Sequence, residues 1–154
     1  LIGTSAGIDP GQVGVALGVS TGVATLGALT ASWLADRIGR IIPVTVALLV
    51  QVVMIWLLQG EMSFLQFMLT AAIFQTFWNL NGPYIMGTIA LSDTTGRVSL
   101  LIPTAQIGGF FLGPVIAGQM LTPGAGYGPA NTLAIACCLL ALAIFIPVAM
   151  RLKR

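Results

Sequence analysis

The sequence predicts an all-α integral membrane protein with five transmembrane helices. Only 6% of its 154 residues are charged and 57% are hydrophobic, whereas a soluble domain carries about 25% charged residues. So few charges cannot cover a water-soluble globule of this size. The apolar runs are also long and continuous, without the alternation of lipid-facing and lumen-facing residues that marks a membrane β-barrel.

Five apolar stretches are close to the length of about 20 residues that a helix needs to cross a bilayer. They are predicted at about 13–35, 41–59, 64–91, 99–121 and 131–150. The connections between them contain residues typical of turns and helix ends. Gly39 and Pro43 flank the start of the second span, and Asp93, Thr94 or Thr95 can cap the fourth.

The first span has a glycine at every fourth position, at Gly14, Gly18 and Gly22. Small residues at this spacing let two helix backbones approach closely in lipid. We expect this surface either to pack statically or to move against another bundle of helices. The second span contains no glycine and is bulky, which is typical of a helix that faces lipid.

The third span differs because it carries polar side chains within an apolar segment. Its amides and polar aromatic residues include Gln75, Trp78, Asn79, Asn81 and Tyr84. Pro83 lies among them and cannot donate a hydrogen bond to the carbonyl of Asn79. These residues either hold helices together by hydrogen bonds or line a cavity that binds a polar or amphipathic solute. We favour the cavity, because polar, aromatic and helix-distorting residues coincide near mid-membrane.

The fourth span returns to small residues, and Gly109, Gly113 and Pro114 predict a second packing surface. The fifth span has no glycine and is expected to face lipid. Its cysteines, Cys137 and Cys138, are adjacent, and neighbours on a helix point about 100° apart. We therefore interpret them as apolar filler, and neither a disulfide nor a metal site is expected.

The cations indicate how the chain lies in the membrane. They occur at three sites, namely Arg37 with Arg40, then Arg97, then Arg151 with Lys153 and Arg154. Two apolar segments separate each site from the next, so all three return to one side, which the positive-inside rule assigns to the cytoplasm. The N-terminal end is then outside and the C-terminus is cytoplasmic. The lipid bilayer is the expected partner, and nucleic acid is not.

Enzyme chemistry is not expected. The sequence contains no histidine, and the serines, threonines and cysteines within the spans have no carboxylate nearby to activate them. We therefore predict no cofactor and no metal ion.

One segment of the chain resembles a known motif. Residues 32–40 resemble the cytoplasmic loop of the major facilitator superfamily of secondary transporters, Gly-x-x-x-Asp-Arg-x-Gly-Arg-Arg. The matching residues are Asp36, Arg37, Gly39 and Arg40. Ser32 stands where the family prefers glycine, and Ile41 where a last basic residue is usual. Three further segments, 78–84, 93–97 and 109–114, resemble the tenth and eleventh helices of bacterial members.

The resemblance implies where this chain belongs in that family. Residues 1–154 would form a partial C-terminal transmembrane bundle, with helices eight to twelve of the family and residues 1–7 as the end of helix seven. The N-terminal half would be absent and would be a partner. A first-half placement, as helices two to six, is the alternative. In the family, helix ten lines the cavity, eight and eleven meet the other half, and nine and twelve face lipid.

The resemblance also implies a function, namely secondary active transport of a small solute by alternating access in a bacterial cytoplasmic (inner) membrane. Asp36, Arg37 and Arg40 would form a cytoplasmic gate with Asp93 and Arg97, and the first pair expected is Arg40 with Asp93. The alternative is that these charged residues only set the orientation of the chain in the membrane by the positive-inside rule. The spans contain no acidic residue, so a group that carries a coupling proton would lie in the other half. A membrane sensor or structural subunit without transport is the alternative function.

Overall fold

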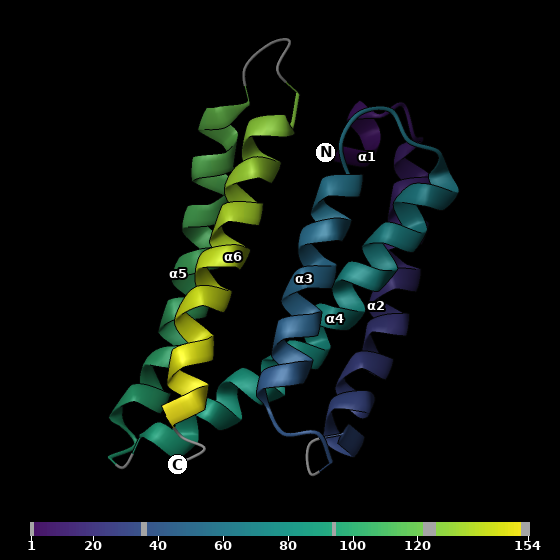
Figure 1. Cartoon of the computed structure of the whole chain (residues 1–154). Coiled ribbons are helices and arrows are strands. Elements are labelled where there is room, and N and C mark those ends of the chain that lie inside the picture. The colour runs from purple at the N-terminus through teal and green to yellow at the C-terminus, as the bar shows by residue number, and fades with distance from the viewer. Residues whose placement is uncertain (1, 35–36, 94, 122–125, 152–154) are drawn as a thin grey trace.

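The computed structural model describes residues 2–34, 37–93, 95–121 and 126–151. These residues form an all-helical bundle (Figure 1). Its helices are α1 (Ile2–Ser5), α2 (Pro10–Leu34), α3 (Ile41–Leu57), α4 (Phe64–Ser92), α5 (Arg97–Met120) and α6 (Gly128–Arg151). The five long helices coincide within a few residues with the five apolar stretches that the sequence predicts.

Local signals explain where the helices begin and turn. The Ser63 hydroxyl accepts a hydrogen bond from the backbone N–H of Gln66 and caps α4. Before α2, the Asp9 carboxylate accepts from the N–H groups of Gly11 and Gln12. Gly60 has a φ of +78° in the turn after α3, a conformation that a side chain would strain.

Three helices are long and apolar enough to cross a membrane by length and composition: α2, α5 and α6. α3 is apolar but has only 17 residues. α4 has 29 residues, but its amides and other polar side chains keep its hydropathy lower. The predicted all-helical class is therefore confirmed, and three helices agree with a membrane protein, whereas the predicted number of five spans is not reached by this measure.

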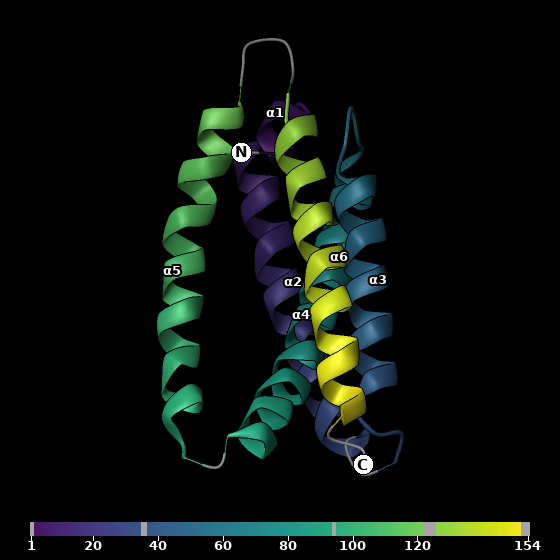
Figure 2. The same ribbon diagram turned by 60° about the vertical axis from the view of Figure 1, so that its left-hand side comes forward.

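The helices divide into a packed group and one separate helix. α4 runs obliquely across the bundle and packs most extensively against α2, while α3 packs against both α4 and α6 (Figure 1). α5 diverges from α4 after the turn that joins them and stands apart from α2, α3 and α4 (Figure 2). None of the described residues of α5 is buried, so this helix contributes no residue to the core of the chain.

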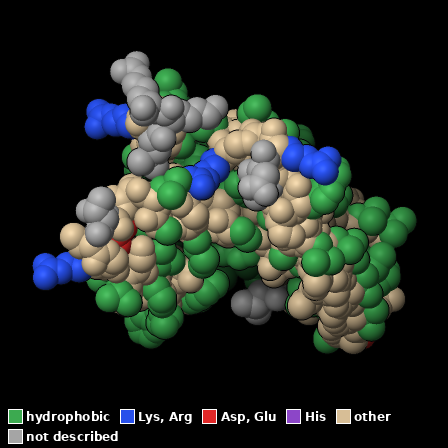
Figure 3. All heavy atoms as spheres, turned by 90° about the horizontal axis from the view of Figure 1, so that it is seen from below, with side chains coloured by type: hydrophobic (Ala, Val, Ile, Leu, Met, Phe, Trp, Pro, Cys, Tyr) green, Lys and Arg blue, Asp and Glu red, His purple; other side chains and the backbone are tan. Residues whose placement is uncertain are grey.

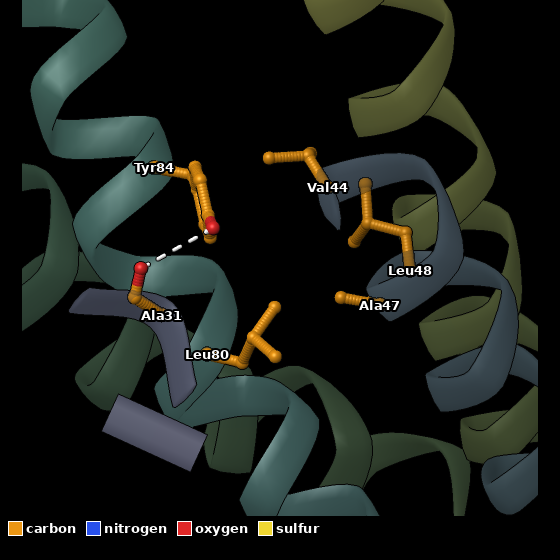
Figure 4. Packing of buried hydrophobic residues seen from close by; sticks show 6 residues of the cluster. All are labelled: Ala31, Val44, Ala47, Leu48, Leu80 and Tyr84. Carbon is orange, nitrogen blue, oxygen red and sulfur yellow. Dashed lines mark hydrogen bonds between the residues drawn. The ribbon is translucent and has the colours of Figure 1, made fainter. Parts of the chain in front are cut away.

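The core near the α2–α3 turn is built by three helices around Tyr84 (Figure 4). Ala31 of α2, Val44 and Leu48 of α3, and Leu80 of α4 are buried with it. Half-buried residues of α6, including Cys138, pack against this cluster. Both cysteines are free, and Cys137 is exposed. A second, smaller cluster at the other end joins the starts of α2 and α4.

The closest approach of two helices occurs at Gly27, where α2 crosses α4. A Cβ atom at this position would collide with the carbonyl oxygen of Thr76 and would lie 3.2 Å from the backbone nitrogen of Leu80. The predicted packing glycines of this helix, Gly14, Gly18 and Gly22, lie on other faces, where a Cβ would meet nothing within 4 Å. The close contact of α2 within this chain therefore lies at Gly27, and the prediction that Gly14, Gly18 and Gly22 form a packing surface against another bundle is untested.

The described cations lie at one end of the bundle, which we call the cation end. Arg37 and Arg40 lie in the turn between α2 and α3, Arg97 begins α5, and Arg151 ends α6. These helix ends share one end of the bundle (Figure 1), and Figure 3 views that end, where blue arginine side chains lie among green hydrophobic ones. Two of the described acidic residues, Asp9 and Glu61, belong to turns at the opposite end, whereas Asp93 lies at the cation end, in the turn between α4 and α5. The predicted return of the cations to one end holds for these four arginines, while Lys153 and Arg154 lie outside the described residues.

Candidate functional site

An open groove of about 480 Å³ lies between α4 and α5. We call it the α4–α5 groove. It is lined by Trp78, Asn81, Gly82, Ile85, Met86 and Ile89 of α4 and by Val98, Leu101, Ile102, Ala105 and Gln106 of α5. Trp78 is at the midpoint of α4, and the lining residues extend from there toward the turn between the helices. The groove therefore occupies the half of the bundle nearest the cation end.

Asn81 is the buried polar residue of the groove. Its side chain is only 6% exposed, and its Oδ1 atom has no hydrogen-bond partner among the described residues. Trp78 is about half exposed, and its ring stacks on Phe74 with centroids 6.3 Å apart. The groove thus combines a buried amide, whose Oδ1 atom is shielded from the groove surface, with an accessible aromatic face, among otherwise mainly apolar side chains.

The other amides predicted for a shared cavity lie elsewhere. Gln75 lines a different cavity of about 740 Å³, together with residues of α2, α6 and the end of α5. The Asn79 Nδ2 atom donates to the carbonyl oxygen of Gln75 over 3.0 Å, within the same helix. This bond satisfies a donor of Asn79 locally, and its side chain lines neither cavity. The sequence placed these amides on one surface because their spacing is helical, but the neighbouring helices divide that surface.

Tyr84 lies in the core and does not reach the groove. Its hydroxyl donates to the carbonyl oxygen of Ala31 over 3.3 Å, and its side chain is 4% exposed (Figure 4). At about 100° per residue, Tyr84 is about 120° from Trp78 around α4. The prediction that Tyr84 lines the same cavity as Trp78 is therefore wrong for this structure, because the tyrosine faces α2 and α3.

The cation end contains a helix cap where the sequence predicted an ion pair. The Asp93 carboxylate accepts hydrogen bonds from the backbone N–H of Ser99 over 2.7 Å and from the N–H and hydroxyl of Thr95. The bond from the Ser99 N–H is the main cause that lowers the pKa of Asp93 from 3.8 to about 2. Asp93 caps the start of α5, and the predicted ion pair with Arg40 is not formed between these two described residues.

The remaining gate residues have separate positions. Arg37 stacks over the ring of Trp33, with 4.3 Å between its Cζ atom and the ring centroid. The Ser32 hydroxyl donates to the carbonyl of Leu29, and Gly39 has a φ of +66° in the turn before α3. Arg97 is exposed. Asp36, the acidic residue of the motif, lies outside the described residues, so its predicted gate contacts are untested.

The predicted packing surface of α5 is uncovered. Gly109, Gly113 and Pro114 are exposed, and a Cβ at either glycine would meet nothing within 4 Å. Phe110 and Phe111 beside them are 67% and 70% exposed. Within the described part of this chain the surface packs against no helix, and its predicted role in packing against another bundle is untested.

Sequence reasoning missed two buried amides that the structure reveals. Gln51 of α3 is 1% exposed, and its Nε2 atom has no partner among the described residues. Asn131 is also buried, and its Nδ2 atom donates to the carbonyl of Leu58 over 3.1 Å, which joins the start of α6 to the end of α3. The sequence did contain a signal for both residues, because each is a lone amide in an apolar span. Burying an amide is costly without a hydrogen-bond partner, so such a residue is expected to have a specific contact.

Comparison of the chain with protein-family models, with curated proteins and with solved structures finds no match. Within the described part of the chain, no group of three or more Cys, Asp or Glu side chains could hold a metal ion. The α4–α5 groove is therefore the candidate site on its geometry alone.

Proposed function

We propose that this chain is part of a secondary active transporter that moves a small solute across the membrane by alternating access. The α4–α5 groove is the observation that carries this proposal. Polar residues inside a membrane are costly, and they are usually found where they face a pathway or one another. In this chain Trp78 and Asn81 face an open groove near the middle of a long helix.

The uncovered glycine faces of α2 and α5 support a second bundle as the partner. A Cβ atom added at Gly14, Gly18 or Gly22 on α2, or at Gly109 or Gly113 on α5, would meet nothing within 4 Å. Small residues are valuable in lipid where another helix approaches closely. The resemblance to the major facilitator superfamily assigns these two helices to the contact with the other half, and rocking of two bundles around a central site would then open the groove to each side in turn.

The cation end supports an orientation with this end in the cytoplasm, and we propose a bacterial cytoplasmic membrane as the location. The described arginines lie there, as the positive-inside rule requires. In this arrangement α3 and α4 also span the bilayer, α3 by tilting little and α4 by crossing obliquely. The gate would involve Arg40 and Asp36, with Asp93 holding the start of α5 in place.

Access to the groove from each side tests the proposal without knowledge of the solute. In the full-length protein, Cys137 and Cys138 are replaced by alanine and a single cysteine is introduced by Ala105→Cys on the groove wall. Alternating access predicts that a membrane-impermeant maleimide labels this cysteine from either side of sealed vesicles. Leu139→Cys on α6, which is exposed away from the groove, is the matched control and should resist labelling from both sides.

Labelling of Ala105→Cys from only one side, under all conditions, would contradict transport. That result would favour the alternative of a membrane sensor or structural subunit. The gate is tested separately by Asp36→Asn in the full-length protein. Unchanged transport rate and unchanged expression in this variant would show that the motif serves only as a topology signal.

A further inference from the structure

We propose that the chain binds an anionic phospholipid at the cation end, with an acyl chain in a crevice between α4 and α6 and the headgroup at Arg151. We call this space the α4–α6 crevice. Its volume is about 330 Å³. It is lined by Leu48 of α3, by Ile85, Thr88, Ile89 and Ser92 of α4, and by Ala141, Ile144, Phe145 and Val148 of α6.

The packing of three helices creates the crevice. α4 and α6 both pack against α3 (Figures 1 and 2), and the lining residue Leu48 is buried, so α3 forms the floor. At about 1.5 Å per residue, the lining from Ala141 to Val148 covers about 10 Å of α6. One leaflet supplies about 15 Å, which is half of the hydrocarbon core. The crevice is therefore short enough to lie within a single leaflet.

The polar groups of the crevice lie nearest the cation end. Thr88 and Ser92 are its hydroxyl residues, and α4 ends at Ser92. Both hydroxyls donate to backbone carbonyls of their own helix, so neither leaves an unpaired donor in the crevice. Farther from this end the lining is apolar, with Ile85 of α4 and Ala141 of α6. This order matches a phospholipid, whose glycerol lies at the surface and whose chain extends inward.

Arg151 lies at the mouth of the crevice. Ile144 and Val148 line the crevice and are 59% and 43% exposed. Arg151 ends α6 one turn after Val148, and its spacing from Ile144 places it within about 20° of the same face of the helix. An arginine at this position can lay its aliphatic stem along apolar surface and keep its guanidinium at the water interface. The apolar crevice and a cation therefore share one face of α6.

The described acidic residues do not neutralise this cation. Asp9 and Glu61 belong to the opposite end of the bundle, and the Asp93 carboxylate caps α5. Arg151 is exposed, and the sequence places Lys153 and Arg154 within three residues of it. Basic residues next to a membrane helix attract anionic lipids, and basic pockets between such helices bind anionic headgroups. Charge and shape thus favour the same occupant.

Photocrosslinking to the full-length protein in nanodiscs tests the proposal. The two probes carry the same diazirine-bearing acyl chain, and they differ in the headgroup, which is anionic phosphatidylglycerol or zwitterionic phosphatidylcholine. Each is added separately to phosphatidylcholine nanodiscs, and peptide mass spectrometry measures labelling of residues 85–92 and 141–148. We expect the anionic probe to label these residues about fivefold more strongly, because one cation near the surface changes lipid affinity by about that factor.

Two pairs of variants assign the effect to the headgroup and to the chain. Arg151→Gln should lower the ratio of anionic to zwitterionic labelling about fivefold. Arg37→Gln is its matched control, because it removes the same charge at the same end, while the Arg37 guanidinium stacks on Trp33 of α2, outside the crevice. Ala141→Trp should fill the crevice and reduce labelling of residues 85–92 by both probes. Its control is Ala143→Trp, at an exposed position of α6 outside the lining.

Equal labelling by the two probes in the unmodified protein would overturn the proposal, and this comparison decides if a tryptophan variant does not fold. An equal loss of the ratio in Arg37→Gln would also overturn it, because the attraction would then belong to the whole cation end. Millimolar inorganic phosphate should leave labelling unchanged, since it has no chain for the crevice; competition would indicate a site for the anion alone. The proposal does not depend on transport, which the two-sided labelling of Ala105→Cys judges separately.

Discussion

Replacement of Gly27 by alanine should separate α2 from α4. A Cβ at this position would collide with the Thr76 carbonyl oxygen, and it would lie 2.9 Å from the Thr76 carbonyl carbon and 3.2 Å from the Leu80 nitrogen. These neighbours are backbone atoms of a helix, so they cannot rotate away as a flexible side chain could. The helices must move apart, which loosens the contact between Ala31 and Tyr84 in the adjacent core cluster.

The expected loss of stability follows from the kind of contact. Insertion of a methyl group into a well-packed core typically costs about 1–3 kcal/mol, and the backbone contact at Gly27 places this variant in the upper part of that range. Alanine is otherwise favoured over glycine within a helix by about 1 kcal/mol. Gly87→Ala on α4 is the matched control, because its Cβ would meet nothing within 4 Å. It should leave stability unchanged or raise it slightly.

Thermal unfolding of the full-length protein in detergent measures the difference, with the fraction that remains monodisperse in size-exclusion chromatography as the readout. For proteins of this size, about 1 kcal/mol shifts the midpoint by about 2–4 °C. We expect Gly27→Ala to unfold several degrees below both the unmodified protein and Gly87→Ala. Equal midpoints for the two alanine variants would refute the close crossing of α2 and α4 at Gly27.

Three further predictions concern polar contacts. Tyr84→Phe removes the bond to the Ala31 carbonyl and should cost about 0.5–1.5 kcal/mol, measured as a lower unfolding midpoint than that of the unmodified protein; an unchanged midpoint would show that this bond does not stabilise the core. Asn131→Leu leaves the Leu58 carbonyl without its donor and should destabilise the junction of α3 and α6 by about 1–3 kcal/mol, measured as a lower unfolding midpoint than that of Thr132→Val at an exposed position beside it. Asp93→Ala should increase hydrogen exchange at the Ser99 amide. Because the folded pKa of Asp93 is lowered to about 2, the cap is fully present above about pH 4 and is lost as the pH falls through about 2; an exchange difference between the variant and the unmodified protein that persists below pH 2 would contradict this role.

The sequence by itself determined the all-helical class, the approximate positions of the long helices and the fact that the described arginines lie at one end of the bundle. Apolar runs of about membrane length can satisfy their backbone groups only within helices, so the five long helices lie close to their predicted positions. The positions of the cations were also predictable from the sequence. Two helices separate Arg40 from Arg97, and two more separate Arg97 from Arg151, so all three lie at the same end of the bundle. Both results depend on spacing along the chain, which a single sequence displays directly.

Only the tertiary structure decided which faces meet. The coincidence of polar and aromatic residues in one span grouped Gln75, Asn79 and Tyr84 with Trp78, but the position of each neighbouring helix put Tyr84 in the core and Gln75 in another cavity. The spacing of Gly14, Gly18 and Gly22 indicated a packing face, yet the close crossing lies at Gly27, because contact depends on where two helix axes approach and not on one helix alone.

Asp93 shows the same limit for charges. Its proximity to a basic loop predicted an ion pair with Arg40, but the free backbone N–H groups at the start of α5 lie nearer and donate to its carboxylate, which caps the helix. A sequence shows which groups can pair, and the fold decides by distance which of them do. Of the five residues that the sequence proposed for the solute site, only Trp78 and Asn81 line the α4–α5 groove, and Gln106 lines it from the facing helix.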